Sequence, residues 1–171
     1  MKNIVNAFAA VLGVIAFAAA ADGQKTAELK AVNSVDIDRY AGRWYEIAKY
    51  PNKFQKQCVG NVTATYTRKP DGKIEVLNEC LRKDGTTDSA KGDAKIADKS
   101  SNAKLKVRFA PGFLSFLPFV WANYWIIDLD PDYRYAVIGE PGRKYLWILS
   151  RKPEMGDAEY GGIVKRIAEQ G

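Results

Sequence analysis

The sequence predicts an all-β protein, an eight-stranded antiparallel up-and-down β-barrel with a C-terminal α-helix packed outside it. Three observations lead to this class. Most of the chain consists of short runs in which polar and apolar residues alternate, as in strands with one buried face. Turn residues separate these runs and no helical pattern intervenes, which favours hairpins in a sheet that closes on itself. After Pro153 the apolar residues recur at helical spacing.

The 171 residues are enough for one domain with a substantial core. Residues 1–20 are predicted to be a signal peptide, and residues 21–171 the single domain. Lys2 supplies a positive start, an apolar run follows, and alanines precede Ala21, as a signal peptidase requires. The alternative is an anchor helix that is not cleaved. No cysteine lies near this site, so we expect an exported protein whose N-terminus carries no lipid anchor.

The first strand is expected to follow a tight turn. Gly42 permits a backbone conformation that a Cβ would resist, and the large ring of Trp44 is expected to fill one end of the barrel. In later strands the alternation separates two faces, with Val62, Ala64 and Tyr66 sharing one of them. The eight strands are expected at residues 44–50, 59–68, 73–82, 86–97, 104–109, 123–129, 134–138 and 145–150.

A helix is expected at the end of the chain. Its apolar stripe consists of Tyr160, Ile163, Val164, Ile167 and Ala168. Two adjacent glycines weaken this helix, so we expect it to depend on packing against the barrel wall.

The composition excludes several classes of function. The sequence has no histidine, which excludes Ser-His-Asp and Cys-His arrangements and the commonest metal ligand. It has no glycine-rich phosphate loop and no cysteine cluster for a metal, and we expect no enzyme activity, metal or cofactor. The formal net charge of +6 is modest and spread along the chain. Nucleic acid is therefore not an expected partner, whereas attraction to an anionic membrane surface is.

Cys58 and Cys80 are the two cysteines of the chain. In an exported protein such a pair is more often a disulfide than a reactive site. The two residues flank a hairpin signal, which would bring them close across adjacent strands, and a bulge at Gly60 is expected to bring them level. The alternative is two buried free thiols.

Three short motifs stand at the predicted strand boundaries. They are Gly42-x-Trp44 before the first strand, the turn Asp130-Pro131-Asp132-Tyr133, and Arg151 after the last strand. With these motifs in this order, residues 33–169 resemble the lipocalin family. The resemblance is closest to bacterial lipocalins of the outer-membrane type, with apolipoprotein D and plant temperature-induced lipocalins as relatives.

The resemblance implies that these motifs build the closed end of the barrel. The residues concerned are Gly42, Trp44, Asp132, Tyr133 and Arg151. The guanidinium of Arg151 is expected to lie over the ring of Trp44 in a cation–π contact. Family members usually continue past the helix into another short strand, which this sequence lacks, and we expect the barrel to form without it.

A barrel of eight strands leaves room inside for one small ligand. The predicted ligand-binding residues on its inner face are Tyr66, Val76, Asn78, Phe109, Trp125, Tyr135 and Trp147. Resemblance to apolipoprotein D implies that Tyr66, Asn78 and Trp147 contact the ligand. The alternative for each aromatic residue is ordinary core packing. An inward amide such as Asn78 needs a hydrogen-bond partner from a neighbour, a water or a ligand.

A second candidate site is the apolar segment at residues 113–121. Its predicted membrane-contacting residues are Phe113, Leu114, Phe116, Leu117, Phe119 and Trp121. The segment is too short to span a bilayer, and Pro118 argues against a central strand. We therefore expect a loop that inserts into a membrane interface. The alternatives are a loop buried on its own barrel and a dimer contact.

Resemblance to bacterial lipocalins implies binding of a small hydrophobic ligand, with fatty acids or lysophospholipids as the expected ligands. The protein would serve lipid storage or transport in the cell envelope, in the periplasm or at the periphery of the outer membrane. One alternative is a different hydrophobic ligand, such as a tetrapyrrole pigment or a sterol-like molecule. Another is the isomerase or epoxidase activity of some relatives, against which the absence of histidine and of a catalytic cysteine pair counts.

Overall fold

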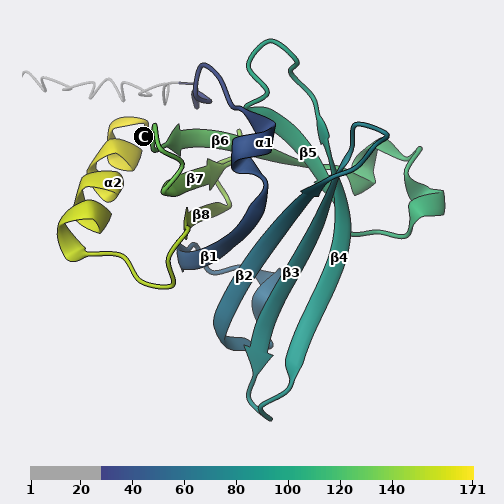
Figure 1. The fold of residues 1–171 in the computed structure, drawn as a ribbon, viewed down its shortest axis with the longest axis horizontal. Helices are drawn as coiled ribbons and strands as arrows, with labels where there is room; N and C mark the ends of the chain where they lie inside the picture. The colour runs from purple at the N-terminus through teal and green to yellow at the C-terminus, as the bar shows by residue number, and fades with distance from the viewer. Residues whose placement is uncertain (1–27) are drawn as a thin grey trace, which may run out of the picture.

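Eight antiparallel strands close into a barrel in the order of the sequence, and β8 pairs with β1 (Figure 1). The strands are β1 (Gly42–Lys49), β2 (Cys58–Arg68), β3 (Ile74–Arg82), β4 (Thr87–Ile96), β5 (Lys104–Arg108), β6 (Ala122–Leu129), β7 (Tyr135–Gly139) and β8 (Leu146–Ser150). This computed structural model describes residues 28–171, so the predicted signal peptide at residues 1–20 lies outside the described residues. The up-and-down barrel is confirmed, and each predicted strand matches an observed one to within two residues at either end.

One end of the barrel is closed by α1 (Ile37–Tyr40) and the start of β1. The carboxylate of Asp36 accepts hydrogen bonds from the backbone amides of Asp38 and Arg39, which caps this one-turn helix. Trp44 is fully buried, and its indole Nε1 donates to the carbonyl oxygen of Tyr40 at 2.8 Å. The helical turn and the tryptophan ring therefore form one plug.

The other end of the barrel is open and uneven. β2, β3 and β4 have 11, 9 and 10 residues, whereas β5 has 5. The long strands extend beyond the rest of the barrel (Figure 1). The connections at this end include the segment with η1 (Lys53–Gln55) and the loop with η2 (Gly112–Leu114) and η3 (Pro118–Val120).

The helix α2 (Asp157–Glu169) packs outside the barrel, beside β6, β7 and β8 (Figure 1). This creates two apolar cores. One lies inside the barrel around Trp44, and the other lies between the barrel wall and the fully buried Ile163 of the helix. The predicted helix and its position are confirmed. Within the described chain, no helix is long and apolar enough to cross a membrane.

The predicted inward orientation of Trp125 and Tyr135 is wrong, because both side chains belong to the outer core beneath α2. In β6 the pairing register with β7 shifts between Ile126 and Asp128. Such a bulge puts two successive residues on the same face. Counting back from Leu129, which packs in the inner core, therefore gives the wrong face for the residues of the strand before Asp128.

In β7 the alternation carries no signal. All five of its residues are buried, since α2 covers the outer face and the inner core covers the other. Val137 belongs to the outer core together with Tyr135, whereas Ala136 and Ile138 belong to the inner core. Hydrophobicity alone cannot distinguish the two faces of a strand that is buried on both.

Candidate ligand cavity

The barrel encloses a cavity of about 500 Å³ that opens at the end opposite α1. Five predicted ligand-binding residues line it: Tyr66, Val76, Asn78, Phe109 and Trp147. They come from β2, β3, β8 and the end of β5. The apolar part of the lining also includes Val62, Ala64, Val107, Val120, Ala122, Ile138 and Leu149. The volume and the largely apolar wall are those of a small-molecule site; contact with a ligand stays a prediction for each residue.

Tyr66 and Tyr124 form the floor of the cavity, and Tyr40 lies beneath them against Trp44. The hydroxyl of Tyr124 is hydrogen-bonded to those of Tyr40 and Tyr66, each at 2.7 Å. Burial raises the pKa of Tyr66 to about 12 and raises the pKa of Tyr40 and Tyr124 well above the ordinary value. The floor is therefore uncharged at physiological pH, and the burial that disfavours a tyrosinate there also disfavours an anionic ligand group.

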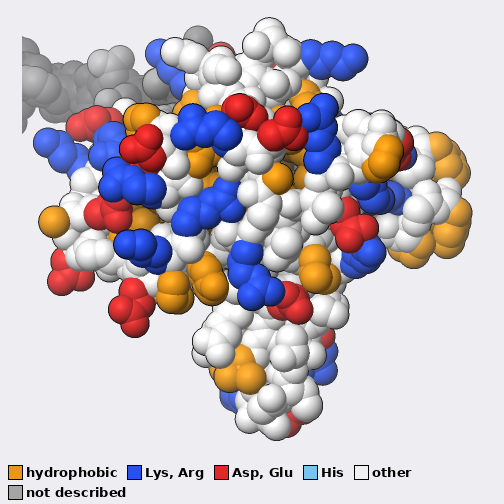
Figure 2. Space-filling view, in the orientation of Figure 1, with side chains coloured by type: hydrophobic (Ala, Val, Ile, Leu, Met, Phe, Trp, Pro, Cys, Tyr) orange, Lys and Arg blue, Asp and Glu red, His pale blue; other side chains and the backbone are white. Residues whose placement is uncertain are grey.

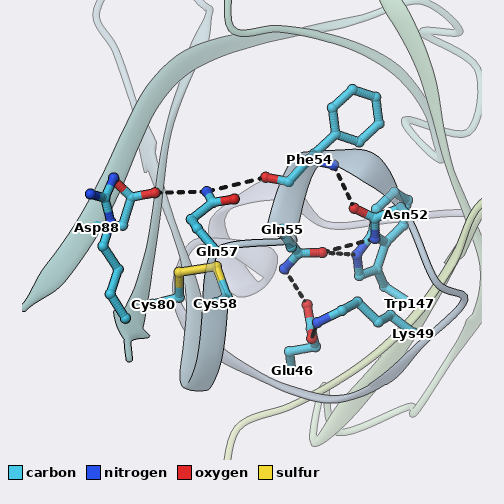
Figure 3. Close-up of a disulfide and its surroundings, with 11 residues drawn as sticks. Glu46, Lys49, Asn52, Phe54, Gln55, Gln57, Cys58, Cys80, Asp88 and Trp147 are labelled. Carbon is cyan, nitrogen blue, oxygen red and sulfur yellow. Dashed lines mark hydrogen bonds and ion pairs between the residues drawn. A yellow bond between two sulfur atoms is a disulfide. The ribbon is translucent and has the colours of Figure 1, made fainter. Parts of the chain in front are cut away.

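Polar side chains gather at the mouth of the cavity (Figure 3). Gln55 donates through Nε2 to Glu46 Oε2 at 2.6 Å, and its Oε1 accepts from Trp147 Nε1 at 3.2 Å and from Asn52 Nδ2 at 3.0 Å. Glu46 also forms an ion pair with Lys49. These bonds hold η1 against the barrel and fix the indole of Trp147 in the cavity wall.

The predicted disulfide between Cys58 and Cys80 is confirmed and joins β2 to β3 at the cavity rim (Figure 3). The register of the two strands shifts between Cys58 and Gly60, so the predicted bulge is present. Beside the disulfide, Gln57 donates to Asp88 at 2.7 Å. This hydrogen bond lowers the pKa of Asp88, so that a carboxylate stands at the rim.

Asn78 is the one half-buried amide in the middle of the cavity wall. Within residues 28–171 its side chain makes no hydrogen bond to protein. A polar group on an apolar wall needs a partner. Asn78 is therefore available to a molecule that occupies the cavity.

The predicted contact between Arg151 and Trp44 is confirmed, with the guanidinium carbon 3.8 Å from the ring centroid. The guanidinium also donates to the backbone carbonyls of Arg39, Tyr40, Ala41, Arg43 and Tyr133, at 2.7–3.4 Å. At Gly42 the backbone φ is +94°, and an added Cβ would lie 3.3 Å from Arg151 Nη1. The glycine therefore supplies both the turn and the space for the arginine.

The turn before β7 is organised by Asp130, the first residue of the predicted motif. The buried carboxylate of Asp130 accepts from the backbone amides of Asp132 and Arg134 and pairs with the Arg134 guanidinium. Asp132 itself is exposed. Tyr133 has the expected structural role, because its hydroxyl accepts from the amide of Asp36 at 2.7 Å and its ring lies under Arg39. The turn is thereby joined to α1.

The loop between β5 and β6 carries three phenylalanines that point into solvent. Phe113, Phe116 and Phe119 are 76%, 77% and 80% exposed; we call them the phenylalanine knob. They form the apolar projection at the right of Figure 2. Leu114 and Leu117 are half-buried. The knob lies beside the mouth of the cavity, since Val120 of the same loop lines it.

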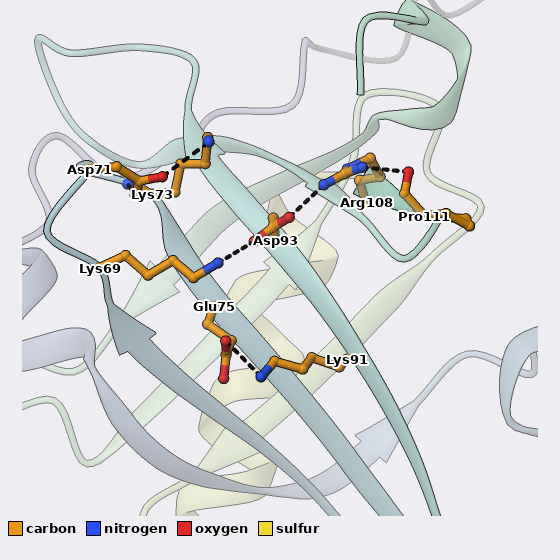
Figure 4. Close-up of polar contacts among 8 residues, drawn as sticks. All are labelled: Lys69, Asp71, Lys73, Glu75, Lys91, Asp93, Arg108 and Pro111. Atoms are coloured by element: carbon orange, nitrogen blue, oxygen red, sulfur yellow. Dashed lines mark hydrogen bonds and ion pairs between the residues drawn. The ribbon is translucent and has the colours of Figure 1, made fainter. Parts of the chain in front are cut away.

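Trp121 has a different place from the knob, because it folds back onto the barrel. Its Nε1 donates to the carbonyl of Ser115 at 2.9 Å, and Lys95 Nζ lies 4.2 Å from its ring centroid. Arg108, which is 5% exposed, pairs with Asp93 and donates to the Pro111 carbonyl at 2.8 Å (Figure 4). The base of the loop is thus fixed to the wall while the knob projects.

Sequence reasoning missed Tyr40, Tyr124, Glu46 and Gln55 as parts of this site. Tyr124 is adjacent to Trp125. Because the bulge in β6 shifts the alternation by one residue, strict alternation predicts that Trp125 points inward, whereas Tyr124 does. Tyr40 lies in a polar segment without alternation. Glu46 lies two residues after Trp44 in the same strand, so its side chain points to the same face, and strict alternation would have predicted this.

An eight-stranded barrel that is sealed at one end and holds an apolar cavity open at the other defines a class of small-molecule-binding protein. Residues 35–171 match the family described as "Lipocalin-like domain". The chain belongs to the lipocalin family, whose members bind small hydrophobic ligands. Within residues 28–171 no group of three or more acidic or cysteine side chains is placed to hold a metal ion.

Named relatives agree with this assignment. Temperature-induced lipocalin-1 of Arabidopsis thaliana is 46% identical over 146 residues, which cover 84% of this chain and 77% of the relative. Outer membrane lipoprotein Blc of Escherichia coli K12 is 40% identical over 127 residues, covering 74% and 67%. Apolipoprotein D of Rattus norvegicus is 40% identical over 126 residues, covering 69% and 61%. The resemblance inferred from the three motifs is confirmed.

Among solved structures, insecticyanin from the tobacco hornworm Manduca sexta has a TM-score of 0.66 against this chain. The two are 24% identical, and the match covers 84% of this chain and 79% of insecticyanin. At this level of identity the likeness supports the barrel fold.

Proposed function

We propose that this protein binds one fatty acid or lysophospholipid in the barrel cavity and serves lipid storage or transport in the cell envelope. The observation that carries the proposal is the cavity of about 500 Å³ with an apolar wall and a polar mouth. Burial of an acyl chain there would remove its apolar surface from water, which favours binding by roughly 0.8 kcal/mol per methylene group. Binding and release, without enzymatic conversion, complete the proposed activity.

The chemistry of the two ends of the cavity supports one orientation of the lipid. A charged head group at the floor would be buried beside neutral tyrosines, with no lysine or arginine among the described lining residues. The mouth carries the amide of Gln55, which donates one of its two amide protons to Glu46. The amide of Asn78 lies in the middle of the wall and is not bonded to protein, and such amide protons can be donated to phosphate or carboxylate oxygens. The acyl chain therefore enters first, and Tyr66, Val76, Phe109 and Trp147 contact it.

The names of two relatives support the compartment. One is an outer membrane lipoprotein and another an apolipoprotein. We infer that this chain is exported by its N-terminal segment to the periplasm or the periphery of the outer membrane.

We also propose that the phenylalanine knob inserts into a membrane surface, where lipid is collected or delivered. Single exposed apolar residues are ordinary, but three neighbouring phenylalanines form a patch of the kind that marks an interaction site. Leu114, Leu117 and Trp121 would support the knob from the loop.

The charge beside the knob fits an anionic lipid surface. Lys95 of β4 and Lys106 of β5 are direct cross-strand partners, an arrangement that is unfavourable because like charges repel. Neither lysine forms an ion pair within the described chain. Anionic head groups would relieve this repulsion while the knob enters the apolar layer.

Native mass spectrometry of residues 21–171 after lipid extraction tests the cavity proposal. We expect a fatty acid or lysophospholipid at about one per chain, or uptake of added palmitic acid. An empty barrel that ignores added acyl chains would contradict the proposal, and a co-purified pigment would replace it with a different hydrophobic ligand.

Two matched variants locate the binding site. Ala64→Phe places a ring in the cavity from β2, and Thr67→Phe places the same ring on an exposed position of the same strand. We expect Ala64→Phe to weaken palmitic acid binding at least tenfold and Thr67→Phe to leave it unchanged. Equal effects would place the ligand outside the cavity.

Cosedimentation with vesicles tests the membrane contact. Replacing Phe113, Phe116 and Phe119 with serine should abolish binding to vesicles that contain phosphatidylglycerol. Val59→Ser, a change at a residue that is 51% exposed and remote from the loop in sequence, serves as the control. Undiminished binding of the triple variant would exclude the knob as the contact.

A further inference from the structure

The wall of the barrel is incomplete between β4 and β5. β4 pairs with β5 only from Asp93 to Ile96, whereas residues 87–91 pair with β3 alone. This part of β4 extends past the short β5 (Figure 1). Among residues 28–171, no backbone hydrogen bond joins residues 87–91 to the loop that follows β5. β4 therefore has a free edge there, and the wall has a gap between this edge and the loop.

The cavity reaches this gap. It is lined by Ala90 on the β4 side, and by Phe109 and Ala122 at the two ends of the loop. Ala90 and Ala122 lie on the inner face, since their cross-strand partners Asn78 and Val107 also line the cavity. Both alanines are nevertheless exposed to solvent. The gap is therefore a second opening of the cavity, which we call the side slot.

The ring of Phe109 crosses the inner end of the side slot. It packs on Gly92 of β4, where an added Cβ would lie 2.8 Å from Phe109 Cδ1 and 3.0 Å from Cε1. The glycine thus leaves the space that the ring occupies. The ring lines the cavity and is 45% exposed. An exposed side chain that has no hydrogen bond to break changes its rotamer readily, so this ring can turn away from the slot.

The mouth of the cavity at the end of the barrel is held more firmly. Gln55 of η1 donates to Glu46 at 2.6 Å and accepts from Trp147 at 3.2 Å. Gln57, just before β2, donates to Asp88 of β4 at 2.7 Å. Lifting this segment to admit a lipid would break several hydrogen bonds, whereas opening the side slot requires the rotation of one apolar ring.

We propose that the lipid enters and leaves the cavity sideways through the side slot, and that the ring of Phe109 is the gate of this slot. The inference rests on the proposed function, because it requires a lipid in the cavity. The slot adjoins the phenylalanine knob, since the loop that borders the slot also carries the knob. A lipid taken from a membrane surface at the knob would therefore reach the cavity without passing the hydrogen-bonded mouth.

Stopped-flow fluorescence with parinaric acid tests this route, because this fatty acid fluoresces more strongly when it leaves water. Phe109→Ala removes the gate. Phe54→Ala is the matched comparison, since it removes a ring that is 57% exposed and lines the cavity from η1 at the mouth. We expect Phe109→Ala to raise both the association and the dissociation rate about fivefold, because a gate slows passage in both directions. The association rate should rise less in Phe54→Ala.

A second pair of variants closes the openings instead. Ala90→Cys provides one free thiol, since Cys58 and Cys80 are bonded to each other. A bulky maleimide is coupled to it after parinaric acid has been loaded, and we expect dissociation to slow about fivefold relative to the unlabelled variant. The same label on Phe54→Cys obstructs the mouth and should slow dissociation less.

The other outcomes overturn the proposal. If Phe109→Ala raises the dissociation rate alone, the ring is a ligand contact and not a gate; unchanged rates also exclude a gate. An equal or larger rise of the association rate in Phe54→Ala, or equal slowing by the two labels, means that lipid passes through the mouth. In these cases the proposed function still stands. If the wild-type chain binds no parinaric acid, the proposed function fails together with this inference.

Discussion

The two ends of the barrel are held by different interactions, although the same strands run through both. At the closed end Trp44 is fully buried, and Arg151 stacks on it and donates to five backbone carbonyls. At the open end a disulfide, a few side-chain hydrogen bonds and one buried arginine hold longer segments, and three phenylalanines face solvent.

This difference separates stability from function. Side chains at the closed end contact one another and the backbone, so changes there should lower the free energy of unfolding without removing a ligand contact. Side chains at the open end surround the cavity or project from the surface. Changes there should alter binding while most of them leave stability nearly unchanged.

Trp44→Ala should give the largest effect. Removal of a fully buried tryptophan costs about 3–5 kcal/mol of the free energy of unfolding, measured by urea denaturation. Phe116→Ala, which truncates a ring that is 77% exposed, should change it by less than about 0.5 kcal/mol. Similar losses in the two variants would contradict the division between the ends.

The disulfide is an exception to this division, because it lies at the open end and yet stabilises the fold. Replacing Cys58 and Cys80 with serine opens a link across a sequence separation of 22 residues. In the chain-entropy model this lowers the free energy of unfolding by about 3 kcal/mol, which urea denaturation measures. We also expect weaker lipid binding, since both cysteines line the cavity.

Arg151→Lys should have a smaller effect at the closed end. Lysine keeps the positive charge but cannot reach five carbonyls with a planar fork of donors, so we expect a loss of about 2 kcal/mol in urea denaturation. Palmitic acid affinity is the internal control and should stay within about twofold of the wild type. A large change in affinity would show that the closed end also shapes the cavity.

The sequence predicts the strands and the closed end well, for a physical reason. Most strands have a polar outer face, so their period is visible and their ends are marked by turn residues. The seal depends on side chains that stand next to strand ends, namely Gly42, Trp44 and Arg151, and each has a local chemical reason to be where it is. The contact between Arg151 and Trp44 is long-range, but both residues stand next to strand ends that the local pattern marks.

The candidate site is predicted only in part. Tyr66, Val76 and Asn78 lie on strands whose outer face is polar or exposed, and their inward orientation is correct. Trp125 and Tyr135 lie where α2 covers the barrel, and there a helix that is remote in sequence supplies the second apolar layer. A one-residue bulge in β6 then inverts the period. Neither the packing of α2 on the barrel nor the bulge in β6 can be recognised from the local sequence.

The tyrosine floor lies between the two ends of the barrel. The smallest effect that we predict is a decrease in the free energy of unfolding at high pH, when Tyr66 loses its proton. Burial raises the pKa of Tyr66 from 10.0 to about 12, so the folded state holds this proton more tightly than the unfolded chain. The resulting stability is present below about pH 10 and is lost as the pH rises toward about 12. From this group we expect a loss of about 1 kcal/mol near pH 11, measured by urea denaturation across that range.

The variant Tyr66→Phe isolates this contribution. Phenylalanine keeps the ring and has no proton to lose, so the decline of stability with rising pH should be shallower in the variant than in the wild type. Tyr160→Phe, a change at a tyrosine that is 39% exposed on α2, is the control and should keep the wild-type slope. If Tyr66→Phe also kept the wild-type slope, burial would not raise the pKa of Tyr66, because water in the cavity would hydrate its hydroxyl. The floor would then be wet in the free protein, and a ligand would have to displace that water.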